Sequence, residues 1–434
     1  MLSLFALPFL ALSSVHASHS FARHHSFARH HALQARDAAP TANATVDMVA
    51  TAWYTGWHSE YLPVANVSWD KYTHMTYAFA LTAPSTGEVS LTDSDPNVLP
   101  VFVSTAHENG VKALISVGGW SGSRSFSDNV ATEENRTAFV QTITNFVQNY
   151  SLDGVDFDWE YPNADGIGCN AQSPDDATNF LSFLQALRAD PVGSNLTLTA
   201  STSLTPWKGP NGTALTDVSG FADVLDWIHI MNYDVWGTWD TAVGPNAPLN
   251  DTCASQQDQQ GSAVSAVAAW TAAGMPAHQL VLGVASYGHS FQVEASNAFD
   301  CDGQALAAYP AFTSTQPAGD SWDAASNTDV CGVTSGYTGV FQFRGLVGEG
   351  WLYPNGSVVE GIDYRFDECS QTPYVYNETS LVMVSFDDAA SFAAKGDYIK
   401  STNLRGFAMW EAAGDYNDIL LDSIREAAGF DGGC

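Results

Sequence analysis

Residues 153–160 read Asp-Gly-Val-Asp-Phe-Asp-Trp-Glu, in which bulky apolar and acidic side chains alternate strictly from Val155 to Glu160. Asp156, Asp158 and Glu160 are two residues apart, so on a β-strand their carboxylates all point to one face. The apolar side chains between them then point to the opposite face, as in a parallel sheet whose back is covered by helices. An acidic surface loop is the alternative, but a solvated loop has no need of interleaved bulky apolar residues. The stretch therefore predicts a buried strand with one acidic face.

Three carboxyl groups this close cannot all be ionised, so at least one is expected to hold its proton near neutral or mildly acid pH. A protonated carboxylic acid beside an ionised partner is the arrangement that protonates a glycosidic oxygen. Glu160 comes last on the strand, and active sites of parallel barrels gather at the C-terminal strand ends. Glu160 is therefore the candidate acid. Asp153 falls on the other strand parity and is interpreted as a structural residue at the entry of the strand.

From residue 47 onward, short apolar runs alternate with segments of helical period, which is typical of an α/β fold with a parallel sheet. Eight such strands predict a closed (β/α)8 TIM barrel. Between residues 287 and 383 the rhythm breaks, and a stretch this long without an amphipathic helix is expected to be functional or a domain of its own. The expected strands are residues 48–54, 75–80, 112–117, 155–159, 196–201, 227–233, 280–285 and 406–409.

The first 46 residues differ in character from the rest. An apolar run over residues 2–12 is followed by Val15-His16-Ala17, which predicts a signal peptide over residues 1–17 and hence a secreted, extracellular protein. Residues 18–46 contain Ser-Phe-Ala-Arg-His-His twice in succession. The His pairs could bind a metal, but a His-rich propeptide or disordered N-terminal segment is the preferred interpretation.

The formal net charge of −32 on 434 residues is extreme. Nucleic acid and anionic membrane surfaces both bind cationic proteins, so neither is expected as a partner. No segment reaches the roughly 18 consecutive apolar residues that a membrane span needs. Nine Asn-x-Ser/Thr sequons fit a secretory route, at Asn43, Asn66, Asn135, Asn149, Asn195, Asn211, Asn250, Asn355 and Asn377.

The chain has six cysteines without Cys-x-x-Cys spacing, so disulfides are expected and a zinc site is not. One cysteine follows the fourth expected strand and another follows the sixth, which puts both in loops on the same face of the barrel. Two more cysteines lie in the long stretch after the seventh strand, and a disulfide between them would stabilise that stretch. The predicted pairs are Cys169–Cys253, Cys331–Cys369 and, by elimination, Cys301–Cys434.

The octapeptide matches the Asp-x-x-Asp-x-Asp-x-Glu signature of family 18 glycoside hydrolases, the chitinase family. Three further stretches resemble motifs of that family on its third, sixth and eighth strands: Ser116-Val117-Gly118-Gly119-Trp120, Met231-Asn232-Tyr233-Asp234 and Met409-Trp410-Glu411. The four motifs stand in the family's order between about residues 47 and 428. The resemblance implies a barrel at 47–288 and 385–434 and a small α+β insertion domain at 289–384, between strand 7 and helix 7, which raises one wall of a deep substrate cleft.

The resemblance also implies the activity of a secreted, fungal chitinase that hydrolyses β-1,4 bonds between N-acetylglucosamine units. Its partners would be chitin and chitooligosaccharides, and it would act as a monomer without cofactor or metal. Glu160 would protonate the leaving oxygen while the acetamide of the sugar attacks the anomeric carbon to give an oxazolinium ion. Asp158 would orient the acetamide and share a proton with Asp156, and Tyr233 would bind the acetamide carbonyl. This substrate-assisted retaining scheme is an exception to the usual two-carboxylate mechanism.

The motifs supply further expected contacts to the sugar chain. Trp410 would form the apolar floor under the sugar at the cleavage point, with Glu411 behind it. Aromatic rings at other strand ends would stack on the polymer, although packing in the core is the alternative. The expected binding residues are Trp410, Asp234, Met231, Trp120, Phe79, Gly119, Ser116, Tyr54 and Trp53.

Two positions depart from the family's pattern. On the first strand, Trp53 stands where the family commonly has a Tyr that supports the catalytic aspartates, and Tyr54 would take that place only in another strand register. After the seventh strand, Tyr287-Gly288-His289 replaces a common Tyr-Gly-Arg, so the Arg that contacts sugar in relatives has no counterpart here.

Two other functions compete with chitin hydrolysis. An endo-β-N-acetylglucosaminidase acting on N-glycans shares the catalytic strand but generally lacks the insertion. A non-catalytic chitin-binding lectin on the same barrel has usually lost the acid, whereas Glu160 is present here with both aspartates.

Overall fold

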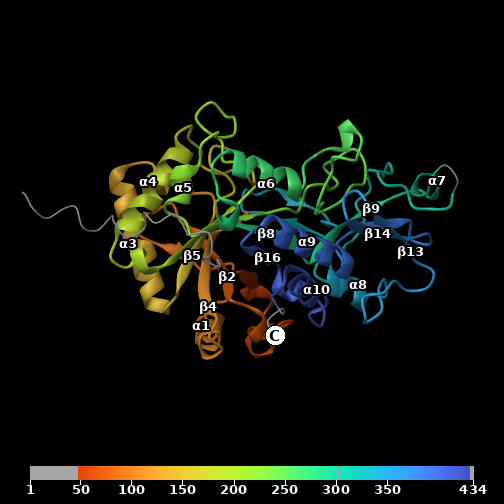
Figure 1. Ribbon diagram of the computed structural model, residues 1–434, viewed down its shortest axis with the longest axis horizontal. Helices are drawn as coiled ribbons and strands as arrows, with labels where there is room; N and C mark the ends of the chain where they lie inside the picture. Colours follow the sequence, from red (N-terminus) through yellow and green to blue (C-terminus); the bar gives the residue numbers. More distant parts are fainter. Residues whose placement is uncertain (1–46, 301–302, 431–434) are drawn as a thin grey trace, which may run out of the picture. The chain divides into compact units, whose positions relative to one another are not determined.

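The computed structural model describes residues 47–300 and 303–430. Eight parallel strands form its main sheet, and β1 pairs with both β2 and β16, so the sheet closes into a ring (Figure 1). The expected (β/α)8 barrel is therefore confirmed. Its strands are β1 (Val49–Thr55), β2 (His74–Thr82), β4 (Lys112–Gly118), β5 (Gly154–Asp158), β6 (Thr197–Thr202), β7 (Trp227–Ile230), β8 (Leu280–Ala285) and β16 (Gly406–Trp410).

Apart from α7 and α8, which come after β9 in the chain, the helices cover the outside of the ring and turn apolar side chains toward the strands. In α3, Phe139, Ile143 and Val147 are buried at helical spacing. The expected N-cap at Asp388 is confirmed, since its carboxylate accepts the backbone N–H of Ser391 at the start of α9. The helices are α1 (Val98–Glu108), α2 (Phe126–Val130), α3 (Glu133–Tyr150), α4 (Asp176–Ala189), α5 (Ser219–Ala222), α6 (Ala263–Ala272), α7 (Ala295–Ala298), α8 (Phe343–Gly348), α9 (Ala389–Thr402) and α10 (Ile419–Ala428).

A second, antiparallel sheet follows β8 in the chain. Its strand order is β12-β9-β15-β14-β13, and Phe291, Tyr374 and Met383 are buried in an apolar cluster of its own. The strands are β9 (Tyr287–Gln292), β12 (Val340–Gln342), β13 (Asp363–Asp367), β14 (Thr372–Asn377) and β15 (Val382–Ser385). Two short pairings complete the list: β3 (Val89–Ser90) on β2, and the hairpin of β10 (Asn327–Thr328) with β11 (Thr334–Ser335). The boundaries 289–384 for the insertion stay a prediction.

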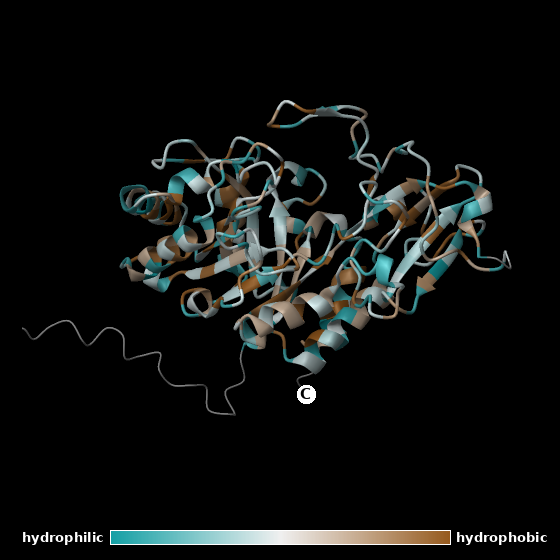
Figure 2. Cartoon of the chain, turned by 90° about the horizontal axis from the view of Figure 1, so that it is seen from above, coloured by the Kyte–Doolittle hydropathy of each residue, from teal (hydrophilic) through white to brown (hydrophobic). Residues whose placement is uncertain are grey.

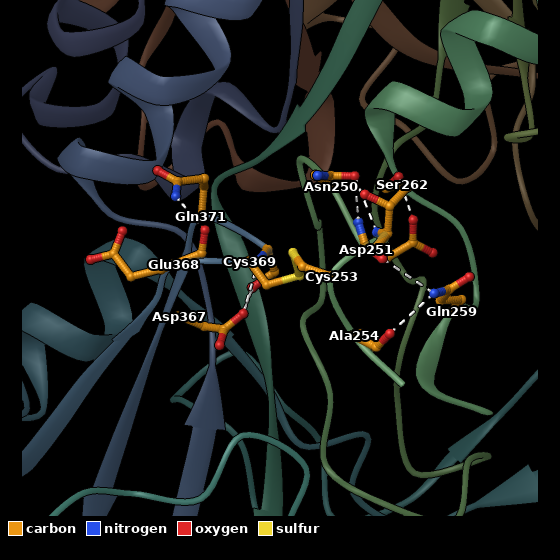
Figure 3. The surroundings of a disulfide bond; sticks show 12 residues. Asn250, Asp251, Cys253, Ala254, Gln259, Ser262, Asp367, Glu368, Cys369 and Gln371 are labelled. Carbon is orange, nitrogen blue, oxygen red and sulfur yellow. Dashed lines mark hydrogen bonds between the residues drawn. A yellow bond between two sulfur atoms is a disulfide. The ribbon is translucent and has the colours of Figure 1, made fainter. Parts of the chain in front are cut away.

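The predicted disulfide pairs are wrong. The bonds are Cys169–Cys331 and Cys253–Cys369, each with Cα atoms 5.7 Å apart. Figure 3 shows the second bond, between the loop after β7 and the turn that joins β13 to β14. The two barrel loops do lie on one face, but each is met there by a different part of the insertion. Cys301 and Cys434 lie outside the described residues, as do the predicted signal peptide and His-rich segment.

The acidic strand has the predicted orientation. Val155, Phe157 and Trp159 are buried in the apolar layer between the barrel and its helices. Asp156 and Asp158 point to the opposite face, into the barrel. Asp158 is the last residue of β5, so the chain that follows it lies at the C-terminal end of that strand. Asp153 accepts the backbone N–H of Ala113 at 2.8 Å, which agrees with its structural interpretation.

Candidate active site

Asp156 lies at the bottom of the site and is completely buried. Its two oxygens accept hydrogen bonds from five side chains on four strands of the barrel. The donors are Ser116 (2.8 Å), Thr199 (2.8 Å), Ser201 (3.0 Å), His229 (3.2 Å) and the indole N–H of Trp53 (3.3 Å). A carboxylate with this many donors is held in one orientation, and none of these bonds goes to Asp158.

The ring of His229 is oriented by its neighbours. Trp227 donates its indole N–H to Nε2 of His229 at 2.8 Å, and an indole nitrogen can only donate. The proton of His229 is therefore on Nδ1, where it faces Asp156. Burial alone would raise the pKa of Asp156, but His229 and the hydroxyl donors outweigh burial and hold that pKa below its ordinary value. Asp156 is thus the permanently charged member of the three carboxyls.

Asp158 sits above Asp156 in the opposite protonation state. It is 4 % exposed, and its Oδ1 atom has no hydrogen-bond partner within the described part of the chain. Burial, followed by the charges of Glu160 and Asp156, raises the pKa of Asp158 well above its ordinary value. Asp158 is therefore a protonated, neutral carboxylic acid, and its Oδ1 atom is available for a hydrogen bond. The proton that Asp158 is expected to share with Asp156 stays a prediction.

Glu160 is fixed through its backbone. Its N–H is donated to the hydroxyl of Ser123 at 3.0 Å, and its carbonyl accepts the side-chain N–H of Asn170 at 2.7 Å. Burial raises the pKa of the Glu160 carboxyl to about 7; a hydrogen bond from Tyr161 acts against this shift and the charge of Asp234 adds to it. Glu160 therefore carries a proton under mildly acid conditions, as the sequence predicted for one of the three.

Two of the three carboxyls open into a cavity of about 460 Å³ at the C-terminal end of the barrel. Asp158 and Glu160 line it and Asp156 lies below. Its walls come from the ends of β1, β2, β5 and β16 and from the loops after β4, β5, β6 and β7. The lining residues are Trp53, Phe79, Trp120, Asp158, Glu160, Tyr161, Ser203, Leu204, Thr205, Met231, Tyr233, Asp234, Val235, Gln260 and Trp410.

Aromatic rings form one side of this cavity. Trp410 stacks on Phe79, with ring centroids 5.5 Å apart, and meets Trp53 edge-on at 5.9 Å. Trp120 is 51 % exposed at the rim, and Trp57, beside Phe79, is 41 % exposed. Rings that are already ordered by each other can stack on a sugar face with little loss of entropy. The peptide bonds that precede Phe79, Tyr161 and Glu411 are cis.

Asp234 is held in a left-handed backbone conformation, with φ of 54°. Its N–H is donated to the side chain of Asn246 at 2.9 Å, and its carboxylate accepts from His289 at 2.7 Å. An unusual backbone angle that its surroundings support is typical of functional positions. His289, which stands where relatives commonly have Arg, thus binds Asp234.

Three predicted binding residues lie elsewhere. Tyr54 points out of the barrel and packs against Tyr77 and Phe102, so the alternative register that would bring it into the cavity is wrong; Trp53 lines the cavity instead, in the register that the alignment gave. Ser116 and Gly119 do not line the cavity. Ser116 bonds to Asp156 beneath it, and Gly119 makes room for the ring of Phe79, which a Cβ there would approach to 2.9 Å.

Several residues around the carboxyls were missed. Thr199, Ser201 and His229 share the inward strand parity of their neighbours, so a count by twos along residues 196–201 and 227–233 could have found them. The loop residues 203–205 and Gln260 carry no comparable signal. Tyr161 directly follows the acid and could have been included on that ground.

The comparisons with known proteins agree with this geometry. Residues 50–415 match the family described as Glycosyl hydrolases family 18, and the chain belongs to that family. A chitinase-like effector of Moniliophthora roreri is 51 % identical over 384 residues, 88 % of this chain and 93 % of that protein. Chitinase A1 of Niallia circulans is 33 % identical over 322 residues, 73 % of this chain and 42 % of that protein. The crystal structure of a chitinase from Rhizomucor miehei superposes with a TM-score of 0.78 at 33 % identity, covering 87 % of this chain and 99 % of that one.

Proposed function

We propose that this protein is a chitinase that hydrolyses β-1,4 bonds between N-acetylglucosamine units with retention of configuration. One observation carries the proposal: a charged Asp156, a neutral Asp158 and a Glu160 with its pKa raised to about 7 are stacked at one end of an aromatic-walled cavity. Neighbouring carboxyls with different protonation states are how a glycosidase separates its acid from its charge-stabilising group. Membership of family 18 supports the same reading.

In the proposed mechanism Glu160 gives its proton to the oxygen that leaves the sugar bound over Trp410. The acetamide oxygen of that sugar attacks the anomeric carbon as the glycosidic bond breaks, giving the oxazolinium ion. Asp158, with its free Oδ1, orients the acetamide, and Tyr233 donates to the acetamide carbonyl. Burial and the nearby carboxyls raise the pKa of Tyr233 well above its ordinary value, so its hydroxyl stays a donor. Water activated by Glu160 then opens the ring and returns the proton.

A second candidate function is chitin binding without hydrolysis. Two relatives, at 51 % and 48 % identity, are named chitinase-like effectors, which supports it. Against it stands the complete set of Glu160, Asp158 and Asp156 in this chain, each with the environment that its role requires. The N-glycan endoglycosidase is less well supported, because the second sheet after β8 belongs to the layout of the chitin-degrading branch.

Incubation with chitohexaose separates these functions. A chitinase should convert the hexamer to dimer, trimer and tetramer, detected by mass spectrometry, and should leave a high-mannose N-glycopeptide intact. Retention of configuration should appear as initial release of the β-anomer by NMR. Binding of chitohexaose without any product at high enzyme concentration would instead establish the binding protein.

The pH dependence follows from Glu160. Its acid form is the active one, so kcat/KM should be level below the pKa of about 7 and fall about tenfold per pH unit above it. A glutamate with an ordinary pKa would already have lost activity near pH 5. Asp234→Asn removes a negative neighbour and should move the falling limb to lower pH. A limb that stays in place in this variant would contradict the assignment of Glu160.

We also propose that the protein is secreted, is glycosylated and acts as a monomer. The sequons, the predicted leader and the two disulfides support an oxidising, extracellular setting. Among the described residues no helix is long and apolar enough to cross a membrane.

A further inference from the structure

The hairpin of residues 323–338 in the insertion has a well-defined shape. At its base, the carboxylate of Asp323 accepts from the N–H and hydroxyl of Thr338, both at 2.9 Å. At its tip, Asp329 accepts from the N–H groups of Cys331 (2.9 Å) and Val333 (2.8 Å). Between these two sets of hydrogen bonds, β10 and β11 pair in antiparallel register. The hairpin is therefore a preformed arm and not a loose loop.

The two ends of this arm are attached on different sides of the barrel mouth. Next to its base, Trp322 stacks on His58 with ring centroids 3.8 Å apart, and His58 directly follows β1 and bonds to Glu411. Its tip is bonded through Cys331 to Cys169, in the loop that follows β5. The arm thus starts above the end of β1 and finishes above the end of β5.

The order of the strands around the barrel shows how far apart the ends of β1 and β5 lie. Going from β1 through β2 and β4 to β5 takes three of the eight steps around the ring, so the two strands are nearly opposite. Eight strands about 4.8 Å apart and tilted as in a TIM barrel enclose a ring about 15 Å across. The nine residues from Asp323 to Cys331 can extend about 30 Å, which is enough to cross it. The direct path passes over the mouth where Asp158 and Glu160 line the cavity.

The exposure of the arm fits a bridge. Residues 324–328 and 332–338 are exposed, whereas the tip at 329–331 is half-buried where it meets the loop after β5. An arm folded against a wall of the cleft would bury one side along its length. In Figure 2 a narrow hairpin stands clear of the surrounding loops. Even its apolar Val333 is 62 % exposed.

We propose that the Cys169–Cys331 bond makes the hairpin a closed strap across the substrate cleft, so that a chitin-type chain enters by threading one free end beneath it. With the bond intact, the inner sugars of a chain whose ends are both blocked cannot reach Glu160. The strap thereby selects for chain ends and for short chains. The proposal rests on the proposed function for the chemistry of the chain, but not on hydrolysis.

Binding tests the strap without catalysis. The Glu160→Gln protein is offered a chitooligosaccharide of about ten sugars that carries a streptavidin on one end or on both ends. With the bond intact, the doubly capped chain should bind at least 100-fold more weakly than the singly capped one. In the Cys169→Ser/Cys331→Ser variant the two chains should bind within threefold of each other. The matched control is Cys253→Ser/Cys369→Ser, which also cuts a link between insertion and barrel and should keep the discrimination.

The outcomes are distinct. Equal binding of both chains to protein whose Cys169–Cys331 bond is verified by a non-reduced peptide map would overturn the strap and leave the proposed function intact. Failure to bind even the singly capped chain would overturn both proposals. If the double serine variant does not fold, replacement of residues 325–336 by a short glycine turn removes the arm while retaining Asp323 and Thr338, and makes the same prediction.

Hydrolysis gives a second readout. On soluble glycol chitin, the loss of viscosity per reducing end released should be at least threefold greater in the Cys169→Ser/Cys331→Ser variant, because internal bonds become accessible. The rate on chitotetraose should change less than twofold. An unchanged viscosity ratio in an active, folded strap variant would contradict the proposal.

Discussion

Replacement of Glu160 by Gln should lower kcat on chitooligosaccharides by at least ~10²-fold and leave their binding within a few fold of wild type. The amide keeps the size and the backbone contacts of Glu160 to Ser123 and Asn170 but has no proton to give. Asp158, the nearest other neutral acid, is almost completely buried below and is needed by the acetamide. Kinetics on chitotetraose and tryptophan fluorescence titration measure the two effects.

A matched control for this variant is Glu108→Gln, an exposed glutamate at the end of α1, which should behave as wild type. Thermal unfolding adds a readout that a merely structural role would not produce. Because the folded pKa of Glu160 is raised to about 7, wild type should lose stability as the pH rises from 5 to 8, whereas the glutamine variant has no such charge to bury. The variant should therefore gain stability relative to wild type at pH 8 but not at pH 5. A variant that retains a tenth of the wild-type rate would contradict the assignment of Glu160 as the acid.

The barrel could be predicted because its strands alternate with helices of clear period. In β5 the alternation of acidic and apolar residues also showed which face points into the barrel. On β1 the polarity pattern alone could not decide which side chains face inward, and only the resemblance to the family favoured Trp53. All seven residues Val49–Thr55 are buried, so the pattern of polarity could not decide whether Trp53 or Tyr54 faces inward. That choice depends on the pairing of β1 with its neighbours, which is a property of the closed ring.

The set of side chains that donate hydrogen bonds to Asp156 could not be predicted from the sequence, for a related reason. Asp156 lies level with Ser116 on one side and Thr199 on the other, because β4, β5 and β6 pair in that register. His229 comes from the next strand but one. Each residue could be placed on the inner face by parity, but their common height follows only from the stagger of the barrel strands. The disulfide pairing was predicted wrongly for the same kind of reason. The cysteines that pair with those of the barrel loops depend on how the insertion folds over these loops.

A sugar without its acetyl group should not be cleaved when it occupies the position over Trp410. Asp156 is held by five donors and is out of reach of a sugar in the cavity, and Asp158 is neutral, so neither is prepared to act as a covalent nucleophile. The free Oδ1 of Asp158 and the hydroxyl of Tyr233 are instead suited to the N–H and the carbonyl of an acetamide.

Partially deacetylated chitin provides the test. Glucosamine should be tolerated elsewhere along the cleft, but every new reducing end should carry an acetyl group, because only that sugar supplies the attacking oxygen. Sequencing of the product oligosaccharides by mass spectrometry reads this directly. A thiazoline analogue of the cyclic intermediate should inhibit far more strongly than a product of the same length, since it resembles the bound ion and not the ground state. Frequent glucosamine at new reducing ends would mean that a carboxylate of the enzyme attacks the sugar, and Asp158 would then have to be ionised during turnover, against the raised pKa that its burial imposes.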